Sequence, residues 1–121
     1  MGEHLLKDGG ERQTSPTGMM REPESDRGRF DLISPIFLRR LAVLYERGAL
    51  KYADRNWEKG MSLSRFLNSA MRHINQYQEG YRDEDHLIQA AWNLSCIVHL
   101  LVMIERGKVP EEFDDFPDYL E

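Results

Sequence analysis

The chain has 121 residues, of which 31% are charged, and a formal net charge of −5. This length suits one domain, and the acidic balance argues against a dedicated nucleic-acid binder, because such proteins carry a basic face that neutralises backbone phosphates. A metal-assisted enzyme fits the balance better, since carboxylates bind a cation and the cation attracts an anionic substrate.

The first 29 residues contain five glycines, two prolines and many charges, without apolar periodicity. Such a segment buries too little apolar surface to offset the entropy of ordering. The sequence therefore predicts a flexible arm over residues 1–29, followed by a folded domain over residues 30–121. The alternative is a tail that closes over the pocket of a neighbouring subunit.

Helical signals begin just after the arm. Ser34 can cap a first helix and Pro35 fits its first turn, and apolar residues recur at helical spacing until Gly48, which we expect to end or bend the helix. A second helix is predicted to follow Ser62 and to end at Gly80. Its apolar stripe consists of Leu63, Phe66, Leu67, Ala70, Ile74 and Tyr77.

A third helix is predicted from about Glu84 to Arg106, and from Leu94 onward it is apolar nearly all round. Neighbours must then cover more than one face, which two short helices cannot do alone. We therefore expect a homodimer or homotetramer in which the third helix, with the first, is shared between chains. Residues 109–121, with two prolines and six acids, predict an irregular strap. The predicted fold is an all-α bundle of three main helices, completed by homo-oligomerisation.

The single cysteine, Cys96, cannot form an intramolecular disulfide, which suits a reducing compartment, and we interpret it as a packed thiol. The N-terminal residues show no charged-then-apolar signal, and the longest strongly apolar stretch, residues 94–103, is interrupted by His99 and too short to span a bilayer. The sequence predicts a cytoplasmic protein that contacts neither membrane nor nucleic acid.

The segment from Lys51 to Gly60, KYADRNWEKG, places many long polar side chains around one indole. Lysine and arginine can hold phosphate oxygens, the indole can stack on a base, and asparagine can bind a base or sugar edge. The alternative is a loop pinned by a half-buried tryptophan with solvated charges. The candidate substrate-binding residues are Lys51, Arg55, Asn56, Trp57 and Lys59.

The third helix carries a polar stripe, because His86, Gln89, Asn93 and Cys96 step by three, four and three residues. Buried polar groups need partners, so the stripe either bonds to a neighbouring helix or buried water, or lines a pocket. Asp83, Glu84 and Asp85 precede it. Asp83 is a suitable N-cap, and acids here also complement the helix dipole.

Two further residues complete the candidate chemistry. Glu46, near the end of the first helix, is the best second source of the oxygen ligands that a divalent ion needs. His73 on the second helix can be a general base, a phosphate ligand, or a boundary histidine bonded to a backbone carbonyl. Arg65 and Arg72 are expected to be solvated or paired with acids.

Five ordered segments resemble the phage dATP/dGTP diphosphohydrolase family, often called MazZ-like, which is related to the all-α MazG-type nucleotide pyrophosphohydrolases. They are GRFDLISP (residues 28–35), LRRLAVLYERGALKYADRNWEKG (38–60), SRFLNSAMRHINQY (64–77), DEDHLIQAAWNL (83–94) and MIERGKVPEEFDDFP (103–117).

The resemblance implies cleavage of dGTP or dATP between the α and β phosphates, yielding the monophosphate and pyrophosphate with Mg²⁺, or Mn²⁺ or Co²⁺ in its place. It implies Glu46, Glu84 and Asp85 as metal ligands, and Glu46, Asp85 and His73 as catalytic residues. Phosphates would bind Lys51, Arg55 and Lys59, the nucleoside would bind Asn56 and Trp57, and His86 and Asn93 would line the pocket. A phage-encoded member would work in the host cytoplasm.

The chain departs from the family's pattern at Leu50, Leu101 and Val102, where relatives carry acids. Loss of an acid at position 50 would remove a ligand one turn from Glu46. Two alternatives therefore stand beside the hydrolase: a non-catalytic protein that sequesters a purine nucleotide, and a helical interaction subunit whose loop contacts another protein.

Overall fold

The computed structural model describes residues 12–22 and 26–120. The chain divides into two compact units between Ile33 and Ser34, close to the boundary predicted at residue 30. Part of the predicted flexible arm, residues 1–11 and 23–25, lies outside the described residues.

The N-terminal unit contains a short hairpin that the sequence analysis did not predict. Strand β1 (Gln13–Thr14) pairs antiparallel with β2 (Met20–Arg21). Between them, Gly18 donates its backbone N–H to the carbonyl of Ser15 at 2.9 Å. Pro16 suits the second position of this turn, and Gly18 adopts a φ of 90° that favours glycine. A single 3₁₀ turn, η1 (Phe30–Leu32), follows.

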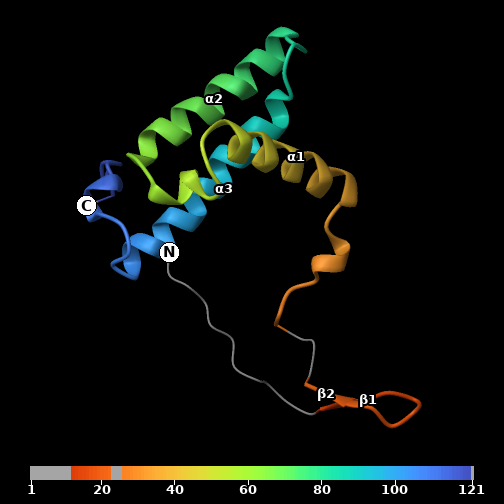
Figure 1. The fold of residues 1–121 in the computed structure, drawn as a ribbon. Coiled ribbons are helices and arrows are strands. Elements are labelled where there is room, and N and C mark those ends of the chain that lie inside the picture. Colours follow the sequence, from red (N-terminus) through yellow and green to blue (C-terminus); the bar gives the residue numbers. More distant parts are fainter. Residues whose placement is uncertain (1–11, 23–25, 121) are drawn as a thin grey trace. The chain divides into compact units, whose positions relative to one another are not determined.

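The C-terminal unit packs three main helices together: α1 (Pro35–Lys51), α2 (Leu63–Glu79) and α3 (His86–Glu105). Figure 1 shows α2 and α3 as an antiparallel pair, with α1 on another side of α3. The predicted mostly helical fold is therefore confirmed. Helix α3 is the element that both other helices contact, so it positions the side chains described below.

Helix boundaries follow their capping residues. Ser34 accepts the backbone N–H of Phe37 at 3.2 Å, as predicted. Gly80 closes α2 with a φ of 104°, the left-handed conformation that glycine adopts without a Cβ clash. Gly48 does not end α1, because the helix continues through it to Lys51.

The start of α3 also differs from the prediction. Its N-cap is Asp85, whose carboxylate accepts the backbone N–H of Ile88 at 3.4 Å. Asp83 is not the cap, and its carboxylate is instead hydrogen-bonded to His86. Glu84 lies before the first residue of the helix. The helix therefore begins at His86 and ends at Glu105.

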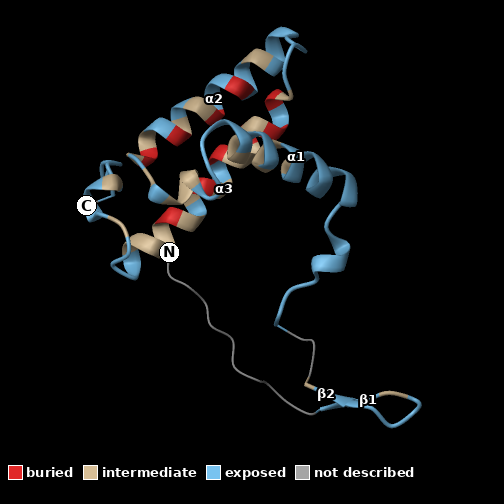
Figure 2. Cartoon of the chain, in the orientation of Figure 1, coloured by how far each residue is buried: buried red, intermediate tan, exposed pale blue. Residues whose placement is uncertain are grey.

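The core of the unit lies between α2 and α3, where Leu63, Phe66, Cys96 and Leu100 are buried together. Burial raises the pKa of the Cys96 thiol to about 12, as expected of a packed cysteine. Figure 2 shows that the buried positions fall on α2 and α3, whereas α1 has none.

The C-terminal segment is irregular apart from one 3₁₀ turn, η3 (Glu111–Phe113). Asp115 accepts hydrogen bonds from the backbone N–H (3.0 Å) and hydroxyl of Ser64, in the first turn of α2. A Cβ added at Gly60 would meet the Phe113 ring at 3.0 Å, so the segment packs closely on the loop that leads into α2. It thus fastens the start of α2.

By length and composition alone, α3 is apolar enough to cross a membrane. Residues 94–103 alone were predicted to be too short to span a bilayer, but the complete helix α3 is longer. Core helices of other proteins pass the same test, and here α3 packs against α2 and α1 and buries two polar side chains, His86 and Asn93.

Large apolar side chains remain exposed on α1 and α3. Val98, near the middle of α3, is 53% exposed. On α1 the exposed set is Ile36, Phe37, Leu38, Val43 and Leu50, and on α3 it also includes Leu87 and Leu94. Helix α2 also exposes Met71, Ile74 and Tyr77, so the exposed apolar residues are not confined to the two helices expected to be shared between chains.

Candidate functional site

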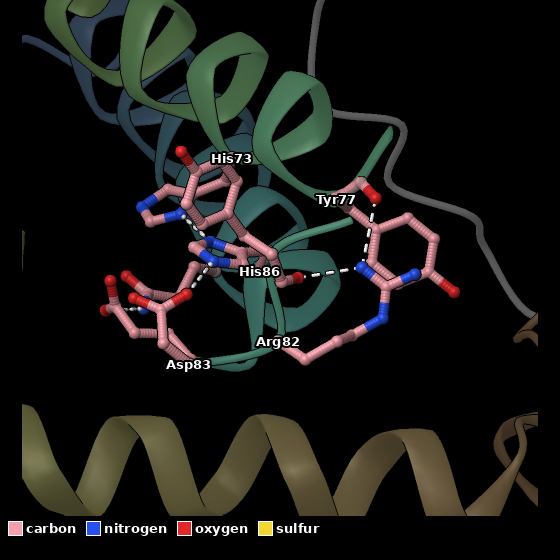
Figure 3. Close-up of polar contacts among 8 residues, drawn as sticks. His73, Tyr77, Arg82, Asp83 and His86 are labelled. Atoms are coloured by element: carbon pink, nitrogen blue, oxygen red, sulfur yellow. Dashed lines mark hydrogen bonds and ion pairs between the residues drawn. The ribbon is translucent and has the colours of Figure 1, made fainter. Parts of the chain in front are cut away.

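Two buried histidines meet where α2 and the start of α3 lie side by side. His73 is 6% exposed and His86 is 2% exposed, and their Nδ1 atoms are 2.8 Å apart. Figure 3 shows the two rings approaching each other from different helices. Because a neutral imidazole has one donor and one acceptor, one ring must donate and the other accept across this contact.

Asp83 decides which histidine donates. Its Oδ1 atom is 3.0 Å from Nε2 of His86, and this hydrogen bond lowers the pKa of the Asp83 carboxyl. A carboxylate only accepts, so the proton of a neutral His86 lies on Nε2. For that neutral form, Nδ1 of His86 accepts and His73 donates from Nδ1.

The second nitrogen of His73, Nε2, is then an acceptor that faces outward. It has no hydrogen bond to any described residue. Among those residues, no buried side-chain nitrogen or oxygen lacks a partner, so this atom must reach the surface. In Figure 3 it points away from His86.

The electrostatic surroundings keep His73 neutral. Its pKa is lowered chiefly because burial disfavours the charged ring, and electrostatic interactions with Arg72 and then His86 lower it further. Asp83 and Glu84 act in the opposite direction but do not reverse the shift. The neutral form that the hydrogen-bond assignment requires is therefore the form expected at pH 7.

Asp83, Glu84 and His86 form a group whose potential ligand atoms lie within 4.8 Å of one another. Gln89 donates to Glu84 Oε1 at 2.6 Å and so orients the second carboxylate. Both acids are exposed, and only His86 is buried. We call Asp83, Glu84 and His86 the acid–histidine group.

The chemistry of this group fits a divalent ion. Two carboxylates supply hard oxygen ligands, and the imidazole suits Mn²⁺, Co²⁺ or Zn²⁺ better than Mg²⁺, which prefers oxygen. A metal-binding histidine usually has its other ring nitrogen held by a second residue. In this chain His73 holds that nitrogen of His86.

Asp85 and Glu46, two of the three predicted metal ligands, are not in this group. Asp85 forms a two-bond ion pair with Arg40, with Arg40 Nε 2.8 Å from Oδ2, and this hydrogen bond holds the Asp85 pKa below its usual range. Glu46 lies on an exposed position of α1. Glu84 is the predicted ligand that the group does contain.

The loop residues lie elsewhere along α3. The segment forms a 3₁₀ turn, η2 (Asn56–Lys59), in which the Trp57 ring packs edge-on against His99 with centroids 4.8 Å apart. His99 follows His86 by thirteen positions in the same helix. At the rise of an α-helix, this places the two residues roughly 20 Å apart along the helix axis. The structure thus does not bring this loop to the acid–histidine group within the described chain.

The charged residues of the loop are exposed except Glu58, which is half-buried. Arg55 pairs with Glu58 at 2.8 Å, and Lys51 lies 5.4 Å from the centroid of the Tyr52 ring. Lys59 is exposed, whereas Asn56 is half-buried. Of the loop candidates, only Trp57 has a clear structural role, because its ring also contacts Tyr45 at 5.7 Å.

Asn93, a predicted pocket residue, is buried and has hydrogen-bond partners. Its side-chain nitrogen donates to the Gln89 carbonyl at 2.8 Å and to the Ser69 hydroxyl at 3.3 Å. Arg72 donates to the same hydroxyl at 3.4 Å. For Asn93, the polar stripe therefore bonds to the neighbouring helix, one of the two outcomes left open by the sequence.

The comparison with known protein families adds to this geometry. Residues 17–109, more than half of the chain, match the family described as dATP/dGTP diphosphohydrolase, N-terminal. The chain belongs to this dATP/dGTP diphosphohydrolase family. The predicted resemblance is confirmed, and the match includes both the loop and the acid–histidine group. No curated protein and no solved structure matched the chain.

In this member of the diphosphohydrolase family, the sequence did not identify Asp83 as a candidate metal ligand. It also did not identify the arginines that lie near the acids and His73. The charges of Arg40 and Arg47 lower the pKa of Asp85, and the charge of Arg72 lowers that of His73. The spacing of Asp83 and His86, three residues apart, was the one signal available. The arginines gave no signal because their proximity depends on helix packing.

Proposed function

We propose that the protein is a divalent-metal-dependent hydrolase that converts dGTP or dATP to the monophosphate and pyrophosphate. The observation that carries this proposal is the acid–histidine group in a member of the diphosphohydrolase family. Water would attack the α phosphorus, the bond to the bridging oxygen would break, and pyrophosphate would leave.

Asp83, Glu84 and His86 would hold the ion, which when bound shields phosphate charge and lowers the pKa of the attacking water. Because one ligand is an imidazole, we expect Mn²⁺ or Co²⁺ to support more activity than Mg²⁺. That Glu46 and Asp85 are additional metal ligands remains a prediction. The variants Glu46→Gln and Asp85→Asn test it, because each removes one carboxylate and should lower turnover if that carboxylate binds the ion.

Cationic side chains near the group would hold the triphosphate. The charge of Arg72 lowers the pKa of His73. Arg40, by its hydrogen bond and charge, and Arg47, by its charge, lower the pKa of Asp85, so positive charge is present near the acids. Guanidinium groups suit phosphate oxygens because their donors form a planar fork. His73 would contribute its outward-facing ring nitrogen as a catalytic residue.

The loop can serve the same site if a second copy supplies it. Lys51, Arg55 and Lys59 are exposed, so they are available to phosphates bound elsewhere. The exposed apolar residues of α1 and α3 support a homodimer or homotetramer. Light scattering at micromolar concentration tests the assembly, and the mass of one chain would contradict it.

Val98→Asp tests the surface involved. Val98 is 53% exposed in one chain, so the substitution should leave the fold intact but dissociate the assembly, because it would bury an unpaired charge between chains. Lys108→Asp, on an exposed position beyond the end of α3, is the matched control. An unchanged mass for Val98→Asp would exclude this part of α3 from the interface.

The test of function is incubation of the purified chain with each deoxynucleoside triphosphate and Mn²⁺, Co²⁺ or Mg²⁺, followed by detection of pyrophosphate. Release of pyrophosphate from dGTP or dATP supports the proposal. No release with any ion would contradict it.

One observation favours the sequestering protein as a second candidate. Leu50, at a position where the resemblance leads us to expect an acid, is 82% exposed on α1 and offers no ligand. A protein without that carboxylate could bind a purine nucleotide and not turn it over. Retention of nucleotide in equilibrium dialysis without release of pyrophosphate would identify this function.

A further inference from the structure

The turn between α2 and α3 carries two of the three residues of the acid–histidine group. It runs from Gly80, which has a φ of 104°, to Asp85, the N-cap of α3. The side chains of Asp83 and Glu84 are exposed, so close packing does not fix their carboxylates. Hydrogen bonds from α3 hold each carboxylate from one side. How well the acids are placed therefore depends on what holds the turn on the side of α2.

Arg82, directly before Asp83, holds the turn on that side. Its Nη1 atom donates to the carbonyl oxygens of Tyr77 at 3.0 Å and of Tyr81 at 2.7 Å. Its Cζ atom lies 3.9 Å from the centroid of the Tyr77 ring. Figure 3 shows the guanidinium of Arg82 lying over Tyr77. These contacts join the residue that precedes the acids to the last turn of α2.

The acceptors in this contact suit a cation. The last carbonyls of a helix have no partner in the helix itself and carry partial negative charge. The Tyr77 carbonyl also accepts the backbone N–H of Gly80 at 3.1 Å, so Arg82 adds a second hydrogen bond where α2 ends. A guanidinium on an aromatic face adds cation–π attraction. Three contacts thus hold Arg82, although the residue is exposed.

An exposed arginine beside two acids could instead bind the triphosphate, because guanidinium groups suit phosphate oxygens. In Figure 3, however, the guanidinium of Arg82 extends away from Asp83. It therefore does not face the ligand atoms of the acid–histidine group, near which an ion would hold the phosphates. The contacts favour a role in holding the turn over a role in binding phosphate.

We propose that Arg82 is a positioning residue for the metal site, which holds the turn so that Asp83 and Glu84 lie beside His86. The inference rests on the metal site of the proposed function. An ordered turn loses less conformational entropy when its carboxylates bind an ion, so the ion binds more tightly. Loss of a residue that orients metal ligands typically weakens ion binding by roughly 10- to 100-fold, and we expect about tenfold for Arg82.

The direction of the change separates positioning from charge. Arg82→Gln removes a positive charge one residue from the ligands, which by Coulomb's law alone should leave the affinity for Mn²⁺ unchanged or raise it. Loss of positioning should instead lower that affinity about tenfold. The measurement is a titration of the full chain with Mn²⁺, in which electron paramagnetic resonance reports the free ion. Parental or tighter binding in Arg82→Gln would overturn the inference.

The matched control is Arg65→Gln, because Arg65 is also an exposed arginine and lies near the start of α2. It removes the same charge far from the turn and should bind Mn²⁺ at least as tightly as the parent. Arg82→Lys keeps the charge but reaches one bond less far and lacks the planar group. Its affinity should lie between those of Arg82→Gln and the parent. Equal weakening in Arg65→Gln and Arg82→Gln would contradict a role specific to the turn.

Two variants of Tyr77 test the same contact without a change in charge. Tyr77→Leu removes the ring under the guanidinium and keeps the backbone carbonyl, so Mn²⁺ should bind roughly threefold more weakly. Tyr77→Phe keeps the ring and should bind Mn²⁺ like the parent. Parental binding in Tyr77→Leu would contradict the contribution of the ring.

Kinetics distinguish positioning from phosphate binding. At saturating Mn²⁺ the ion site is filled in parent and variant alike, so Arg82→Gln should show the parental KM for the nucleotide. A raised KM together with parental affinity for Mn²⁺ would identify a phosphate contact and overturn the inference.

The order of the turn can be measured without any metal. The ¹H–¹⁵N heteronuclear Overhauser effect of the full chain reports picosecond-to-nanosecond motion at each backbone amide. In Arg82→Gln the values for residues 81–85 should fall, while those within α2 and α3 stay at the parental level. Unchanged values in the turn would overturn the inference whether or not an ion binds.

The outcomes also separate this inference from the proposed function. If the parent binds Mn²⁺ and Arg82→Gln binds it equally well, the inference is wrong while the metal site stands. Absence of Mn²⁺ binding by the parent would overturn both. The expected affinities without release of pyrophosphate from any nucleotide would support the inference and count against the proposed activity.

Discussion

The two ends of α3 differ in the kind of side chain that they bury. At its start, His86 is buried against a second imidazole and an acid, whereas near its other end His99 and Leu100 pack with Trp57 and the apolar core. Burying polar groups costs stability unless they are hydrogen-bonded, whereas aromatic packing adds to stability directly. The proposed chemistry thus lies at the first end, whereas the second end contributes to the core.

The same comparison changes how the loop is interpreted. Its density of charges and its indole suggested a nucleotide site, but Trp57 contacts Tyr45 and His99 within the fold. A ring already packed edge-on against two neighbours has less surface left for a base. The loop therefore differs from the acid–histidine group, whose carboxylates are exposed.

The largest expected effect is on turnover at the start of α3. Asp83→Asn and Glu84→Gln each remove a charged ligand, so each should lower the turnover rate by on the order of a thousandfold, or about 4 kcal/mol of barrier. Both side chains are exposed, so thermal unfolding should change little. Parental rates in both variants, in an assay for pyrophosphate, would refute this role.

The next largest effect is on stability at the other end. Trp57→Ala should lower the free energy of unfolding by about 2–3 kcal/mol, less than for a fully buried tryptophan because Trp57 is half-buried. Urea unfolding measures it. Trp57→Phe, which keeps an aromatic ring, is the control and should lose less. A stable Trp57→Ala variant with weakened nucleotide binding would instead support base stacking by the loop.

A smaller effect concerns the ion pair of Arg40 and Asp85. Because both side chains are partly exposed and screened by solvent, Arg40→Gln should lower the free energy of unfolding only slightly at pH 7. Arg40 lowers the folded pKa of Asp85 below the ordinary 3.8, so the stabilisation is present above pH 3.8 and is lost as the pH falls through the folded value. Urea unfolding of parent and variant at several pH values should show the difference shrink in acid. A difference that does not change with pH would contradict the assignment.

The smallest expected effect is from the N-terminal segment. Removing residues 1–27 should leave the melting temperature nearly unchanged, because the described residues of that segment are almost all exposed and the units divide at Ser34. Differential scanning calorimetry decides this. A large decrease would mean that the segment packs on the body or on another chain.

Local signals in the sequence predicted much of the fold. Ser34 and Gly80 act through contacts with near neighbours, and the stripe of His86, Asn93 and Cys96 depends only on helical spacing. Gly48 misled because the cost of one helical glycine, roughly 1 kcal/mol, is small beside the packing of a whole helix.

The candidate site was less predictable because its contacts join distant residues. Arg40 and Asp85 are 45 residues apart, and the pairing of His73 with His86 depends on how α2 and α3 align. Asp83 and Asp85 are both suitable caps, and the choice between them follows from the bonds of Asp83 to His86 and of Asp85 to Arg40. Only the packed structure reveals those bonds.

The most direct test of the proposed metal centre is electron spin echo spectroscopy of the full chain loaded with one equivalent of Mn²⁺, which detects a directly bound imidazole nitrogen. The expected result is nitrogen modulation in the parent and in His99→Gln, and its loss in His86→Gln. Bound Mn²⁺ without nitrogen modulation in the parent, or unchanged modulation in His86→Gln, would contradict the assignment of the ion to Asp83, Glu84 and His86.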